Sequence, residues 1–131
     1  MKTKTLFTIN AWVAAIFGLA FFLIPGQVIP LFGPAVNGPL KSLGQLYGAA
    51  LVMIAVLTWA VRNSPDSEAR RAVILALLVG DSAGFLAALI AQLSGVFNSL
   101  GWLSVAIYLV LALSYAYVNF QPAPAPEFTR S

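Results

Sequence analysis

The chain has 131 residues, of which 60% are hydrophobic and only 8% are charged, with a formal net charge of +3. A soluble domain of this size has a large surface to cover and carries about 25% charged residues, so the composition excludes an ordinary soluble domain. The sequence has no cysteine and no histidine, which excludes disulfides and the commonest metal ligands. No basic stripe with interleaved aromatic residues points to nucleic acid. We therefore expect a membrane protein without a cofactor, a metal or a nucleic-acid partner.

Four apolar segments are each long enough to cross a bilayer as a helix, which takes about 20 residues. They are residues 6–24, 43–61, 73–93 and 102–120. We predict one domain over residues 1–120, an all-α integral membrane four-helix bundle. The first segment is not expected to be a cleaved signal peptide, because Ile24, Pro25 and Gly26 make a poor small-residue cleavage site.

The basic residues are divided unequally between the two sides of such a bundle. Four spans place the N-terminus, the second connection and the C-terminus on one side. That side holds six basic residues: Lys2, Lys4, Arg62, Arg70, Arg71 and Arg130. The other side holds only Lys41. Because Lys and Arg are enriched on the cytoplasmic side, we predict an up-down-up-down bundle with both termini in the cytoplasm.

The connecting segments differ in character. Residues 25–42 are rich in proline and glycine around an apolar patch, and we expect this segment either to lie in the outer interface or to fold back over the bundle as a lid. In the second connection, Ser64 followed by Pro65 is typical of a helix start, so we predict that the third helix begins there with a short extension. Residues 121–131 alternate proline and alanine, and we expect a disordered tail. Whether its last residues are native stays open.

Small residues recur at a spacing of four within the spans. Helices in lipid gain no hydrophobic energy by associating, so close packing relies on small residues at the contacts. We predict that five glycines pack the helices together: Gly18, Gly44, Gly48, Gly80 and Gly84. Packing within one chain is the favoured interpretation, and a homodimer is the alternative.

Asp81 is the only acidic or basic residue between Arg71 and Glu127. At 1.5 Å per residue it lies about 3 Å from the middle of the third span, where an aspartate costs about 2.5–3.5 kcal/mol to insert. Such residues usually face the interior of a bundle and are functional candidates. A structural role, in which Asp81 holds neighbouring helices together through hydrogen bonds, is the alternative that stays open.

Depth along the helices indicates which polar side chains accompany Asp81. The expected partners of its carboxyl group, at a similar depth, are Asn10, Ser114 and Tyr115. Four further side chains are expected in the outer half. Tyr108 would extend a polar path from Asp81, and Gln92 would meet Gln45 and Tyr47. We expect this set to form a polar core or a ligand-binding site.

Several short motifs occur in a characteristic order along the chain. They are Asn10, Phe17-Gly18, Gln45-Leu46-Tyr47-Gly48-Ala49-Ala50, Arg70-Arg71, Gly80-Asp81 and Gly101-Trp102. In this order they resemble small bacterial four-helix membrane proteins of the DoxX-like and neighbouring uncharacterised families. The resemblance implies a bacterial inner (cytoplasmic) membrane and assigns no chemistry. Some DoxX-like members are accessory to quinone or thiosulfate oxidation, but no cysteine or redox motif here supports carrying that role over.

Two functions are compatible with these features. The first is a membrane protein that binds or passes a small apolar or cationic molecule, or a proton, through a polar pocket around Asp81. The second is an accessory or structural subunit of a larger membrane complex, with no ligand of its own. An enzyme is not expected, because general acid–base chemistry usually needs a second positioned group. The expected partners are therefore lipid, a small hydrophobic ligand, and another membrane protein or a second copy of the chain.

Overall fold

The computed structural model describes residues 2–121, and every regular element in that range is helical. The elements are α1 (Thr3–Leu23), α2 (Pro25–Val28), the 3₁₀ helix η1 (Ile29–Phe32), α3 (Gly38–Val61), α4 (Glu68–Leu93) and α5 (Gly101–Asn119). Four of them, α1, α3, α4 and α5, are long and apolar enough to cross a membrane. The predicted all-α class and four membrane spans are therefore confirmed. The predicted tail lies outside the described residues, apart from Gln121.

The helix starts follow from local capping, and one prediction about them is wrong. The Asn37 side chain accepts a hydrogen bond from the Leu40 backbone N–H at 2.8 Å, so α3 begins several residues before its apolar run. The N-cap of α4 is Ser67, not Ser64. The Ser64 hydroxyl instead donates to the Val61 carbonyl at 2.7 Å, because this residue closes the end of the preceding helix. An extension of α4 before its span is present, but it starts at Glu68.

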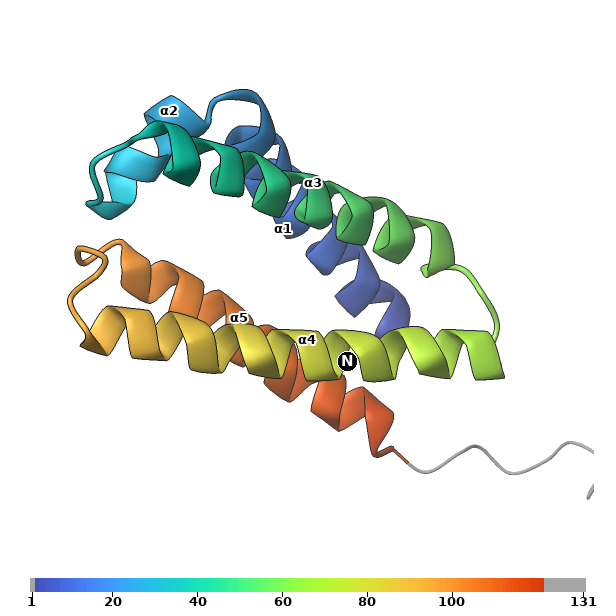
Figure 1. Ribbon diagram of the computed structural model, residues 1–131. Helices are drawn as coiled ribbons and strands as arrows, with labels where there is room; N and C mark the ends of the chain where they lie inside the picture. Colours follow the sequence, from blue (N-terminus) through green and yellow to red (C-terminus); the bar gives the residue numbers. More distant parts are fainter. Residues whose placement is uncertain (1, 122–131) are drawn as a thin grey trace, which may run out of the picture.

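The first hairpin consists of α1 and α3, which cross where Gly18 and Gly48 meet (Figure 1). A Cβ atom on Gly48 would lie 2.5 Å from the Phe22 backbone nitrogen and 2.7 Å from the Gly18 carbonyl oxygen. Only glycine permits two backbones to approach this closely. Gly44 lies against the Ile29 side chain, which seats the short α2–η1 segment on α3.

The second hairpin consists of α4 and α5. Gly84 lies beneath the Tyr108 ring, whose nearest atom would be 2.4 Å from a Cβ placed there. Near the connection between the two helices, Gly101 lies against the Gln92 side chain. Gly80 differs from the other predicted packing glycines, since a Cβ atom on it would meet nothing within 4 Å. The packing role predicted for Gly80 within the chain is therefore wrong for the described residues.

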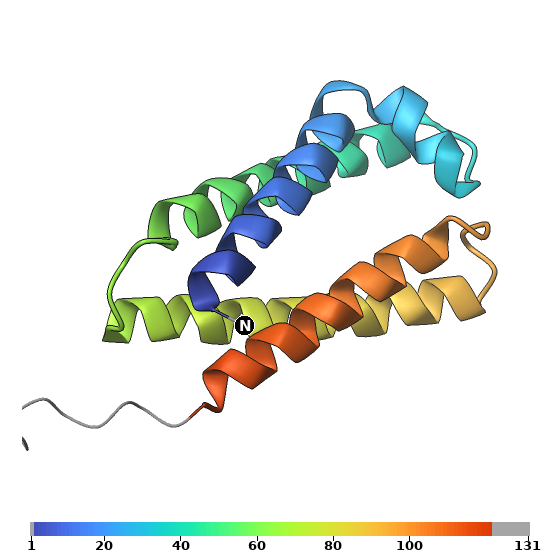
Figure 2. The ribbon, with the colours of Figure 1, turned by 180° about the vertical axis from the view of Figure 1, so that it is seen from behind.

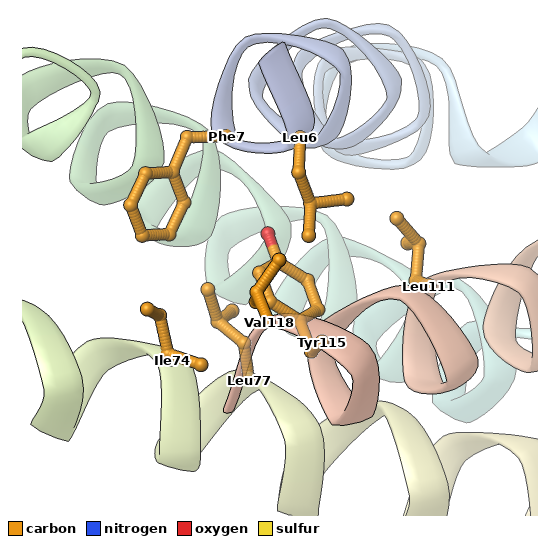
Figure 3. Packing of buried hydrophobic residues seen from close by; sticks show 7 residues of the cluster. All are labelled: Leu6, Phe7, Ile74, Leu77, Leu111, Tyr115 and Val118. Atoms are coloured by element: carbon orange, nitrogen blue, oxygen red, sulfur yellow. The ribbon is translucent and has the colours of Figure 1, made fainter. Parts of the chain in front are cut away.

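The two hairpins join mainly near the N-terminal end of α1. Figure 3 shows the buried apolar cluster there, with side chains from α1, α4 and α5. Its members are Leu6, Phe7, Ile74, Leu77, Leu111, Tyr115 and Val118. The Phe7 and Tyr115 rings are 6.2 Å apart and tilted, and Tyr115 is fully buried. In both ribbon views the N-terminal end of α1 lies near α4 and α5, and α1 moves away from them along its length (Figures 1 and 2).

The opposite ends of the hairpins are joined through their connections. The Asn98 backbone N–H donates to the Phe32 carbonyl at 2.8 Å, and its side-chain Nδ2 donates to the Leu31 carbonyl at 3.0 Å. The Phe32 and Phe97 rings meet edge to face at 6.3 Å. The first connection is thus partly helical and contacts the second hairpin. This contact favours the predicted lid over the alternative of a segment that lies only in the outer interface.

Candidate functional site

A cavity of about 340 Å³ separates the two hairpins. All four long helices line it, and most of the lining is aliphatic or aromatic. The polar lining side chains are Asn10, Tyr47, Asp81, Ser104 and Tyr108. Among the residues that the structure describes, no lysine or arginine lines the cavity. Its size falls within the range of about 300–1,000 Å³ that is usual for small-molecule sites, and an apolar pocket with a few convergent polar groups is typical of them.

Asp81 supplies the only acidic group in this lining. It lies at the middle of α4, which runs from Glu68 to Leu93, so its carboxyl group is at hydrocarbon depth in a spanning helix. The Oδ2 atom is buried and has no hydrogen-bond partner among the described residues. A buried acceptor without a partner costs about 1–3 kcal/mol, and more when it is charged, so this atom is available to a ligand.

Two tyrosine hydrogen bonds tie the hairpins together on either side of Asp81. Toward the connection end, the Tyr47 and Tyr108 hydroxyl oxygens are 2.6 Å apart and join α3 to α5. Toward the apolar cluster, Asn10 Nδ2 donates to the Tyr115 hydroxyl at 2.6 Å and joins α1 to α5. The Tyr115 hydroxyl points toward α1 in Figure 3. These bonds hold the hairpins at a fixed separation above and below the carboxyl group.

Aromatic rings close the connection end of the cavity. The Tyr47 ring meets Phe21 edge to face at 5.3 Å, and Phe21 stacks on Phe32 at 6.1 Å. Phe32 in turn contacts Phe97 of the second hairpin. This row of rings runs from Tyr47, which lines the cavity, to the second hairpin.

Four predicted site residues do not line the cavity: Ser114, Tyr115, Gln92 and Gln45. Ser114 donates to the Val110 carbonyl one turn earlier in its own helix, at 2.7 Å. Gln92 donates to the Asn98 carbonyl at 3.0 Å, and its Oε1 atom is buried without a partner. Gln45 donates to the Phe22 carbonyl at 3.3 Å. The expected meeting of Gln92 with Gln45 and Tyr47 is therefore wrong in the described part of the chain.

The expected partners of the Asp81 carboxyl group are also corrected. Asn10 and Tyr115 bond to each other, and no described side chain bonds to Asp81. The cavity lining contains four of the predicted site residues, namely Asp81, Asn10, Tyr47 and Tyr108. Ser104 is a lining residue that sequence reasoning missed. Its spacing from Tyr108 and Leu111, four and seven residues, places all three on one helical face and was a usable signal.

Comparison with known proteins gives one match. The model of a family described as a domain of unknown function (DUF8292) matches residues 1–120. The chain belongs to the DUF8292 family. No curated protein and no solved structure matches it.

The DUF8292 match covers all four spans and the connections between them. The chain is therefore a multi-pass membrane protein of that family, and the family description assigns it no chemistry. The resemblance to DoxX-like proteins stays a prediction. What this DUF8292 chain does has to be inferred from the cavity, its single carboxyl group and the groups that enclose them.

Proposed function

We propose that the cavity between the hairpins binds a small cationic or apolar molecule, with Asp81 as the group that recognises its polar end. The observation that carries this proposal is the buried, unpartnered Oδ2 atom of Asp81 in an otherwise mostly apolar cavity of about 340 Å³. A cavity of about 150 Å³ lined by aliphatic and aromatic side chains is already large enough to bind benzene. The space here accepts a molecule larger than that.

The chemistry of the lining favours a positively charged or N–H-donating ligand. Asp81 is the only ionisable group in the cavity besides the tyrosines, and no basic residue there competes for it. A carboxylate in hydrocarbon has a high free energy unless it is paired. A cationic ligand would pair with it and lower that free energy. Neighbouring hydroxyl groups on Tyr47 and Tyr108 engage each other and leave the carboxyl group to the ligand. A relay of protons along Asp81 is less favoured, because no described side chain bonds to its carboxyl group.

Butylamine binding tests this function directly, because the molecule is small enough for the cavity and carries one amine. In nanodiscs, native mass spectrometry measures the bound fraction as butylamine is titrated. We expect Asp81→Asn to weaken binding about tenfold to a hundredfold, since hydrogen bonds to charged groups contribute about 1.5–3 kcal/mol. Asp66→Asn is the matched control, because it makes the same change at an exposed acid that pairs with Arg71. Equal binding by both variants would falsify the proposal.

We also propose that the protein lies in a bacterial inner membrane with both termini in the cytoplasm. The six-to-one distribution of basic residues supports this orientation. Because the chain has no cysteine, single cysteines report the sidedness of each connection without background. A membrane-impermeant maleimide should label Ala35→Cys in intact spheroplasts and leave Asn63→Cys unlabelled until the membrane is opened. The reverse pattern contradicts the orientation.

A second candidate function is an accessory subunit of a larger membrane complex. The observation that favours it is a shallow groove on the lipid-facing side of α1 and α3, lined by small residues between two tryptophans. Its lining is Ala11, Trp12, Ala15, Ala55, Val56 and Trp59. Small residues at a helix surface permit another helix to approach closely. Purification from native membranes separates the candidates: a stoichiometric protein partner lost in Ala15→Leu supports the accessory role.

A further inference from the structure

The lining of the cavity between the hairpins is more exposed on one side than on the other. Its lining residues on α1 and α5 are all buried or half-buried. On α3 and α4, by contrast, several lining residues are exposed, and Met53 is 66% exposed. The exposed ones are Tyr47, Ala50, Met53, Leu57, Ala76 and Gly80. The opening therefore lies between α3 and α4.

Gly80 forms the edge of this opening beside Asp81. A Cβ atom on Gly80 would meet nothing within 4 Å, so the space next to it is empty. Both residues lie at the middle of α4, whose exposed surface faces lipid in a spanning helix. The opening is consequently at the depth of the hydrocarbon and not at the depth of the headgroups.

Contacts described above cross the other sides of the cavity. On the far side the Asn10–Tyr115 hydrogen bond joins α1 to α5, and no side-chain hydrogen bond joins α3 to α4 in the described part of the chain. The apolar cluster around Tyr115 fills one end. At the other end the hydrogen bond between Tyr47 and Tyr108, which both line the cavity, joins the two hairpins. A ligand therefore reaches Asp81 most directly from the side, through the lipid.

From these features we infer that the ligand is a hydrophobic amine taken from within the bilayer. Its nitrogen lies at the Asp81 carboxyl group, and its hydrocarbon body extends through the opening between α3 and α4 into lipid. This inference rests on the proposed function, to which it adds the ligand class and the route. It also gives Gly80 a role, because a large side chain at that position would fill the opening.

An amine fits this site because of the charge balance in hydrocarbon. A carboxyl group and an amine form a pair with no net charge, whether the proton is on oxygen or on nitrogen. Such a pair avoids the cost of bringing a single ion to the centre of the membrane. A hydrocarbon chain in the opening meets only apolar neighbours, such as Met53 and Leu57, and remains partly solvated by lipid.

Dodecylamine and butylamine together test the route, since only the longer amine extends through the opening. Gly80→Trp fills the opening without altering Asp81. We expect it to bind dodecylamine about tenfold more weakly than the wild type, because overpacking has a cost of that size. Butylamine binding should weaken less than dodecylamine binding, because the short amine does not extend through the opening. Val79→Trp is the matched control, because Val79 is 61% exposed, adjoins Gly80 and does not line the cavity. Native mass spectrometry from nanodiscs measures the binding of both amines to the wild type and to each of the two variants.

Ala76→Trp is a second variant for the same purpose, one turn before Gly80 on the same edge, in case Gly80→Trp fails to fold. Circular dichroism and gel filtration check folding. If Gly80→Trp and Ala76→Trp both bind dodecylamine as tightly as the wild type, the lateral route is overturned. Weaker butylamine binding in Asp81→Asn would then still support the proposed function. If Asp81→Asn binds butylamine as tightly as the wild type, the proposed function and this inference are both overturned. Equal binding of dodecanol and dodecylamine to the wild type overturns the choice of an amine.

Discussion

The hydroxyl oxygens of Tyr47 and Tyr108 lie 2.6 Å apart and connect α3 of one hairpin to α5 of the other. The same Tyr108 ring covers Gly84, which has no side chain to displace it. One tyrosine thus packs within its own hairpin through its ring and bonds to the other hairpin through its hydroxyl group. The separation of the hairpins at this depth, and with it the width of the cavity, depends on that bond.

The strength of this bond is measurable by a double-mutant cycle. Tyr47→Phe and Tyr108→Phe each remove one hydroxyl group, and the double variant removes both. We expect a coupling of about 0.6 kcal/mol, the average for hydrogen bonds between membrane helices. Unfolding in mixed micelles of increasing SDS content measures it. Tyr117→Phe is the control, because Tyr117 is exposed and far along α5. Strictly additive effects would contradict the bond.

Glycine substitutions should separate close packing from open space. In Gly48→Ala the new Cβ atom would lie 2.5 Å from the Phe22 backbone nitrogen, and backbone atoms cannot rotate aside. We expect a loss of about 1–3 kcal/mol of stability, the usual cost of overpacking. Gly80→Ala should be neutral or stabilising by up to about 1 kcal/mol, since alanine is the better helix former and meets no neighbour. Thermal unfolding in detergent ranks the two variants, and a larger loss for Gly80→Ala would refute the packing described.

The buried pair of Asn10 and Tyr115 should respond differently to one substitution and to two. Tyr115→Phe leaves the Asn10 amide without its acceptor in a site where both residues are nearly inaccessible. We expect a loss of about 1–3 kcal/mol, which is the cost of an unsatisfied buried donor. Adding Asn10→Leu should recover part of that loss, because replacing both partners by apolar groups is nearly neutral. Thermal unfolding in detergent measures both variants. If Asn10→Leu destabilises Tyr115→Phe further, the hydrogen bond between the two side chains is contradicted.

Asn98 should control the exposure of the connections. Asn98→Ala removes the hydrogen bond to the Leu31 carbonyl and the one that its Oδ1 accepts from the Leu100 N–H. Losing about 1 kcal/mol raises local opening roughly fivefold, so amide exchange in residues 25–37 should speed up by that factor. Hydrogen–deuterium exchange followed by mass spectrometry measures it. Asn63→Ala is the matched control, because Asn63 is exposed in the other connection. Identical exchange in both variants would show that Asn98 does not hold the first connection.

The number and position of the spans were predictable, because hydrocarbon requires long apolar runs that stand out in any sequence. The site was only partly predictable. A rise of 1.5 Å per residue gives the depth of Asp81, Ser114 and Tyr115, but not the direction in which each side chain points. In a soluble helix the apolar stripe supplies that direction. Here the lipid-facing sides are as apolar as the interior, so the stripe is missing and Ser114 was placed on the wrong face.

The helix boundaries failed for a local reason. Ser64 and Pro65 have the residue types of a helix start, yet Ser64 bonds backwards to Val61 and the cap forms three residues later at Ser67. The short helices in residues 25–32 depend on contacts with α3, such as that of Ile29 with Gly44, which sequence alone does not reveal. The role of Gly80 was misread for a related reason, since a glycine that admits another helix and a glycine that leaves a gap look alike in a sequence.

The pairing of α1 with α3 and of α4 with α5 has a consequence for how the protein is made. Each hairpin is contiguous in the chain, so the ribosome delivers the first pair complete before the second pair emerges. Each hairpin can insert into the bilayer as a unit, because its two helices are close in the chain and meet readily. Assembly then reduces to docking two preformed halves through a small set of side chains. A chain severed between Arg62 and Ser67 should therefore reconstitute from its two fragments when both are synthesised in the same membrane.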